Sequence, residues 1–182
     1  MPRPYDTLAA TPHRVAGICD SGTAALGELS NQSPWARSIG AVGSLVAVRL
    51  DLLTPGIEVG LVTTNLNAMV AFYEGFLGLE FQGEVEFPGG SQRRYSIGSG
   101  VVKLVTYDPP PPAPAAPGGG RAQAGVRYFT IGVKDLRTVA EAFARSEYEV
   151  VETLSEFAPV PGTAWMFAAD PDGNWIELFG TL

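Results

Sequence analysis

The chain has 182 residues, of which 46% are hydrophobic and 17% charged, and this composition is typical of a globular protein. A net charge of −7 argues against nucleic acid or an anionic membrane surface as a partner. The sequence contains no run of about 18 apolar residues, so no membrane span is expected. The single cysteine, Cys19, excludes an intrachain disulfide, so the reducing cytoplasm is the expected location.

Residues 1–55 carry little sign of regular structure. They are rich in Ala, Gly, Ser, Pro and Thr as far as residue 44, without a sustained helical or strand period. Residues 44–53 are apolar enough for one strand, and the stretch lacks the pattern of a secretory signal. We predict a flexible N-terminal leader; an arm that docks onto the folded domain is the alternative.

Residues 56–108 form the first predicted module. Residues 58–63 have the length and β-branched content of a strand. Asn65 is a suitable N-cap for a helix whose apolar positions recur as far as Leu77, and Gly78 stands where a C-cap glycine belongs. Three further strands, separated by glycine-containing turns, are predicted at residues 79–87, 92–97 and 101–107. The order is therefore β-α-β-β-β.

Residues 109–125 are almost entirely Pro, Gly and Ala and predict an exposed linker. The same order of elements then returns over residues 126–182. Asp135 is the predicted N-cap of a second helix, and Trp165 and Phe167 are expected to pack beneath that helix. The predicted strands are residues 128–133, 148–154, 163–169 and 174–179.

The two modules make an internal repeat. Lining up their helices brings Glu58 opposite Tyr128, and lining up their last strands brings Lys103 opposite Glu177. Neither module can bury both faces of its elements alone, so the pair is expected to pack together and leave a cavity between curved sheets.

Several short motifs carry a resemblance to a known family. They are Val62-Thr63-Thr64-Asn65-Leu66, Ala71-Phe72-Tyr73 with Leu77-Gly78-Leu79, Val133-Lys134-Asp135-Leu136, and Asp170-Pro171-Asp172-Gly173-Asn174 ending in Glu177-Leu178. In this order and spacing the chain resembles the vicinal oxygen chelate superfamily of glyoxalases, bleomycin-resistance proteins and dioxygenases. The resemblance implies an α+β fold in which two βαβββ modules form a cup-shaped mixed sheet. It does not fix the reaction, because the superfamily hosts several chemistries.

The family's metal sites use four positions, which correspond here to Glu58, Lys103, Tyr128 and Glu177. Their usual occupants are His or Gln, Glu, His and Glu. Lys103 would repel a metal ion, and the only histidine, His13, lies in the leader. An extradiol dioxygenase, which needs two histidines and a carboxylate on iron, and a metal-dependent glyoxalase I are therefore disfavoured. No cofactor is expected; a divalent magnesium or manganese ion on Glu58 and Glu177 is the alternative.

The resemblance and the strand alternation together indicate the residues of a site. Glu58, Lys103 and Glu177 are the predicted catalytic group, in which protonated Lys103 acts as electrophile and a glutamate as general base on a bound carbonyl compound. A self-satisfied ion pair that fills the space of a lost metal is the alternative. The predicted substrate-binding residues are Tyr128, Arg94, Tyr107, Trp175 and Phe179.

Two classes of function follow from these residues. The first is a glyoxalase-like lyase, isomerase or hydrolase that acts on an apolar or aromatic carbonyl compound without a His-based metal site. The second is a non-catalytic protein that sequesters a small molecule, as the resemblance to bleomycin-resistance proteins implies. The family pairs its half-domains within one chain or between two chains. The linker permits either arrangement, so a homodimer remains open.

Overall fold

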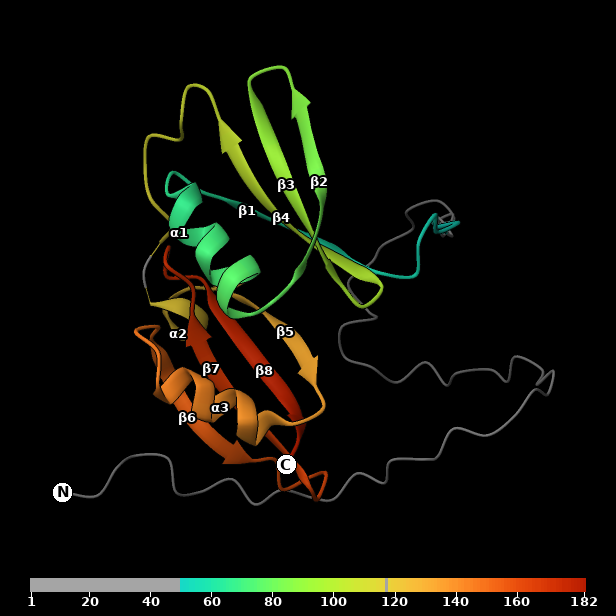
Figure 1. Ribbon diagram of the computed structural model, residues 1–182, viewed down its shortest axis with the longest axis vertical. Coiled ribbons are helices and arrows are strands. Elements are labelled where there is room, and N and C mark those ends of the chain that lie inside the picture. Colours follow the sequence, from blue (N-terminus) through green and yellow to red (C-terminus); the bar gives the residue numbers. More distant parts are fainter. Residues whose placement is uncertain (1–49, 117) are drawn as a thin grey trace, which may run out of the picture. The chain divides into compact units, whose positions relative to one another are not determined.

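The computed structural model describes residues 50–182 except residue 117 (Figure 1). The predicted leader, residues 1–55, therefore lies almost wholly outside the described residues. Within the described part, none of the helices is both long enough and apolar enough to span a bilayer.

The first module is a four-stranded sheet with one helical segment. Its strands are β1 (Glu58–Val62), β2 (Glu80–Phe87), β3 (Gly90–Ile97) and β4 (Gly100–Tyr107). The helical segment between β1 and β2 begins as α1 (Leu66–Val70) and continues as a π-helical turn, η2 (Ala71–Phe76). The strand order is β1-β4-β3-β2, with β1 parallel to β4 and the remaining pairs antiparallel.

The second module repeats this plan. Its elements are β5 (Tyr128–Val133), α3 (Leu136–Ala144), β6 (Val150–Glu156), β7 (Thr163–Ala169) and β8 (Trp175–Thr181), in the sheet order β5-β8-β7-β6. A short helix, α2 (Gly119–Ala122), lies between the modules in the chain. The register pairs Gly60 with Lys103 and, at the equivalent place, Thr130 with Glu177. The predicted fold class, α+β with two βαβββ modules, is confirmed.

The two module helices begin in different ways. Asp135 caps α3 as predicted, since its side chain accepts a hydrogen bond from the backbone N–H of Thr138. Asn65 stands at the predicted N-cap position of α1, but its side chain makes no cap bond; its backbone N–H donates to the hydroxyl of Thr63. Gly78 ends the first helical segment with φ at 68°, a conformation that favours glycine.

One hydrophobic core joins the two modules. Rings of the first helical segment pack against the second module, with Phe72 4.8 Å from Tyr148 and Phe76 4.8 Å from Phe143 between ring centroids. The hydroxyl of Tyr73 donates to Asp170 at 2.8 Å, and both residues are buried. Each sheet turns one face to this core. We name the opposite faces the first outer face, on β1–β4, and the second outer face, on β5–β8.

The expectation that Trp165 and Phe167 pack beneath the second helix is wrong. The alternate residues of β7, Ala164, Met166 and Ala168, are buried in the core instead. Trp165 and Phe167 consequently lie on the second outer face, where they are partly exposed. Both sets of alternating residues in β7 are apolar, so alternation alone does not tell which set faces inward.

Candidate functional site

A charged cluster stands on the first outer face. The register places Lys103 beside Gly60 of β1 and Arg94 of β3. Glu58 receives both cations: Arg94 donates to its two carboxylate oxygens at 2.6 and 3.3 Å, and the Lys103 ammonium lies 3.0 Å away. The hydrogen bonds from Arg94 and then from Lys103 lower the pKa of Glu58 to about 2. This carboxylate is therefore ionised at neutral pH and a weak base.

Glu177 stands on the second outer face in a different environment. It accepts a hydrogen bond from the Thr130 hydroxyl, its register neighbour on β5. No cation lies within ion-pair distance of Glu177 among the described residues. Its carboxylate thus keeps acceptor capacity that Glu58 has already used.

Aromatic rings surround Glu177. Phe167 is the centre of the group, with centroid distances of 5.1 Å to Tyr128, 5.6 Å to Trp165 and 5.5 Å to Trp175. Phe179 contacts Phe157 at 5.6 Å. Separations of this size are typical of favourable edge-to-face ring contacts. We name Tyr128, Trp165, Phe167 and Trp175 the aromatic cluster.

The predicted site residues fall into two groups. Glu58, Lys103 and Arg94 meet on the first outer face, and Tyr107 lies on the same face, where its ring is 5.9 Å from Phe87. Tyr128, Trp175, Glu177 and Phe179 lie on the second outer face. Across residues 50–182, apart from residue 117, no hydrogen bond, ion pair or ring contact joins the two faces. Lys103 is close to Glu58, as expected, but makes no contact with Glu177.

The donor set does not fit the metal that the resemblance implies. Among the described residues, no group of three or more His, Cys, Asp and Glu side chains could hold a metal ion. At the four family positions an ammonium and a phenol stand where ligands are needed, and the ammonium is ion-paired to Glu58. We therefore assign no catalytic step to a metal.

Strand alternation places Thr130 on the same face as Tyr128, but sequence reasoning missed Trp165, Phe167 and Phe157 as members of the second outer face. Pairing Glu177 with its neighbour on β7 would have found Phe167, because it is the direct partner of Glu177 in the register. That pairing depends on the strand order, which a single sequence does not state.

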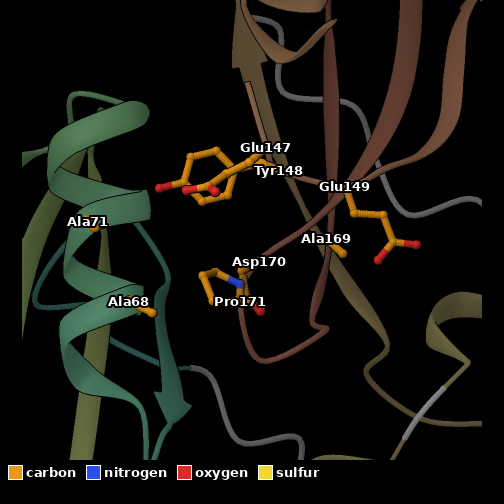
Figure 2. A pocket seen from close by; sticks show the side chains of 8 residues that line it. All are labelled: Ala68, Ala71, Glu147, Tyr148, Glu149, Ala169, Asp170 and Pro171. Atoms are coloured by element: carbon orange, nitrogen blue, oxygen red, sulfur yellow. The ribbon is translucent and has the colours of Figure 1, made fainter. Parts of the chain in front are cut away.

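A hollow of about 450 Å³ lies between the first helical segment and the second module (Figure 2). Ala68 of α1 and Ala71 of η2 form one wall, and Glu147, Glu149 and Asp170 line the other side. Asp170 is already engaged by Tyr73 and by Asn174. The hollow is therefore a seam between packed modules and not a separate ligand site.

Comparison with known proteins identifies the fold family. The family model of the Glyoxalase/Bleomycin resistance protein/Dioxygenase superfamily matches residues 57–178. The chain belongs to this superfamily. No curated protein matches its sequence.

Solved structures of the superfamily have the same fold at low sequence identity. A glyoxalase family protein from Bacillus cereus has a TM-score of 0.62 at 16% identity, covering 75% of this chain and 99% of that one. A glyoxalase family protein from Enterococcus faecalis has a TM-score of 0.51 at 23% identity, covering 71% and 96%. The trypanothione-dependent glyoxalase I of Leishmania major has a TM-score of 0.50 at 17% identity, covering 68% and 84%. At these identities the superfamily likeness concerns the fold alone.

Proposed function

We propose that this protein binds a flat, uncharged or anionic aromatic compound on its aromatic cluster. The observation that carries the proposal is the group of four rings around Phe167 on a partly exposed sheet face. Ligand sites are mostly aromatic and apolar, with a few polar groups that orient the ligand. Glu177 and Thr130 are the polar groups within this cluster.

The charges of the first outer face fit this ligand. Glu58 is neutralised by two cations, so the cluster of Glu58, Arg94 and Lys103 carries one net positive charge. Such a face attracts a carboxylate or polarises a carbonyl oxygen.

The aromatic cluster forms one wall of the proposed ligand site, and we propose that the opposite wall comes from a second copy of the chain. The helix-bearing face of each sheet is used in the shared core, so the outer faces of one chain do not close over one another. Large apolar side chains remain exposed on both: Val62 at 45%, Tyr107 at 47% and Tyr128 at 47%. A two-fold dimer that brings the first outer face of one chain over the second outer face of its partner would cover them.

Catalysis on a carbonyl compound is the second candidate, and the state of Glu177 favours it. Glu177 is held by one hydroxyl and has no cation within ion-pair distance among the described residues, so its carboxylate can accept a hydrogen bond from a substrate, whereas Arg94 and Lys103 occupy the oxygens of Glu58. Lys103 from the opposing face would be the electrophile. Replacing Lys103 with Met would then abolish turnover without unfolding the protein, and a variant with full activity would refute this assignment.

Calorimetric titration with a panel of flat aromatic carboxylates and aldehydes tests the binding proposal. Trp165→Ala is expected to weaken binding about tenfold or more, since it removes a ring contact with the ligand and its buried area. Phe81→Ala is the matched control, because Phe81 is an exposed aromatic whose ring contacts Tyr95 on the core side of the first sheet. Stoichiometric binding without product supports a binder; repeated turnover supports the enzyme. Equal effects of both substitutions would contradict the assignment of the aromatic cluster.

Mixing two variants tests the shared site. Lys103→Met damages only the first outer face and Trp165→Ala only the second. If the site is built between chains, subunit exchange between the two variants creates one intact site in every mixed dimer. No recovery of binding after confirmed exchange would show that each site lies within one chain.

A further inference from the structure

Part of the linker lies on the second outer face as a strap. Helix α2 begins beside the start of β5 and β8, where Gly120 lies in van der Waals range of Trp175 and Tyr128. Its next residue, Arg121, reaches Glu152 on β6, with 2.7 Å between the guanidinium and the carboxylate. Since β5 and β6 are the two edges of the sheet, the backbone of residues 118–122 lies at the β5–β8 side and the Arg121 side chain reaches towards the β6 edge. We name these residues the strap.

Gly119 allows the strap to lie directly on Trp175. A Cβ at this position would fall 1.9 Å from a ring atom of Trp175, which no side chain could tolerate. The φ of Gly119 is also positive, at 49°, so its backbone conformation favours glycine as well. At Gly120 a Cβ would lie 3.6 Å from the same ring, an ordinary contact distance. Only one of two adjacent glycines is therefore required for the close approach.

Two hydrogen bonds from Arg127 hold the strap in place. Its side chain donates to the backbone carbonyl of Gly119 at 2.8 Å and to that of Ala116 at 3.3 Å. Sequence reasoning gave this segment the role of an exposed linker because Pro, Gly and Ala dominate it. The hydrogen bonds from Arg127 and the contact with Trp175 involve residues outside the linker, so the composition of the linker does not reveal them.

We propose that the strap is the end wall of the aromatic ligand site and sets the length of ligand that the site accepts. Gly119 and Arg127 are positioning residues in this scheme: they hold backbone against Trp175, so a ligand has free access to Phe167 and Trp165 but not to the covered end of the cluster. The inference rests on the proposed function for its ligand and on the geometry of the strap for the wall itself.

The wall is tested first without any ligand. In a chain whose other tryptophans, Trp35 and Trp165, are replaced by Phe, acrylamide quenching reports the exposure of Trp175. Gly119→Ala is expected to raise the quenching constant about twofold, as is Arg127→Met, because each releases the strap from the ring. Gly120→Ala is the matched control and should leave quenching unchanged. If all variants, the control included, show the same quenching constant as the parent chain, the proposal that the strap covers Trp175 is wrong.

Ligand length is tested next with naphthalene carboxylate and anthracene carboxylate, which differ by one fused ring. In the otherwise unaltered chain the shorter compound should bind about tenfold more tightly or better, and Gly119→Ala should remove that preference while Gly120→Ala keeps it. Equal affinities in the unaltered chain overturn the length limit. If neither compound binds the unaltered chain, the proposed function fails, whereas the quenching result still decides whether the strap covers Trp175.

Discussion

Glu58 illustrates how neighbours decide the chemistry of a residue. Its position in the repeat matches that of a metal ligand in the family, but Arg94 and Lys103 occupy both of its oxygens. Because these bonds favour the ionised form, the pKa of Glu58 falls to about 2. We predict that carbon-detected NMR of the Glu58 carboxylate finds its midpoint near this value and not near 4.5, the usual value for glutamate.

Replacing Arg94 with Met should raise the midpoint of Glu58 towards its usual value, since the Arg94 bond is the largest cause of the shift and only the Lys103 bond remains. Arg93→Met is the control: Arg93 pairs with Glu84 and Glu74 and does not touch Glu58. An ordinary midpoint in the unaltered protein would mean that the cluster on the first outer face does not persist in solution. Glu58 would then be available as a base, and this result would favour catalysis on a carbonyl compound.

At the scale of the element, the two module helices offer a natural comparison. Asp135 and Asn65 occupy equivalent positions before α3 and α1, but only Asp135 forms the cap bond, to Thr138. We predict that Asp135→Ala costs about 0.5–2 kcal/mol in the free energy of unfolding. Asn65→Ala should cost clearly less, because no cap bond is lost. Urea unfolding of both variants measures the difference.

Asp135 and Asn65 also show how much of the structure could be predicted from the sequence. The strands and the two module helices were predicted within a few residues, because turn glycines and apolar periodicity are local signals; α2, within the predicted linker, was not. The N-cap position of Asn65 was predicted as well, but the absence of its side-chain cap bond was not, because a single sequence does not show how a side chain is oriented. Likewise, the π-helical turn η2 follows from packing that the apolar pattern leaves undetermined. Equal costs of the two Ala substitutions would contradict this account of the capping.

At the scale of the whole molecule, the position of the candidate site depends on which faces of the two sheets pack together. Sequence periodicity identified Glu58, Lys103, Tyr128 and Glu177 as repeat equivalents and the register confirms this. It could not tell whether the outer faces close on one another or the helix-bearing faces share a core, because both arrangements bury apolar surface. The Tyr73–Asp170 bond spans 97 residues of sequence and belongs to the second arrangement.

The burial of Asp170 makes the stability of the seam between the modules depend on pH. Burial raises the pKa of Asp170, and the hydrogen bonds from Asn174 and Tyr73 partly oppose this effect. A raised pKa in the folded state means that Asp170 contributes most stability below its unfolded pKa. The contribution is lost as the pH rises through the folded pKa. The Tyr73 hydroxyl limits this loss, because it stabilises the charged form.

We predict that Tyr73→Phe lowers the free energy of unfolding by about 1.5–3 kcal/mol at neutral pH, the usual range for a hydrogen bond to a buried charge. The loss should shrink at about pH 3, where the neutral carboxyl needs the donor less. Tyr148→Phe is the matched control, because its ring packs on Phe72 while its hydroxyl makes no hydrogen bond among the described residues. Urea unfolding of the three proteins at both pH values measures the effect. A loss that is independent of pH would mean that Tyr73 stabilises the seam through ring packing alone, and that Asp170 does not couple the modules to pH.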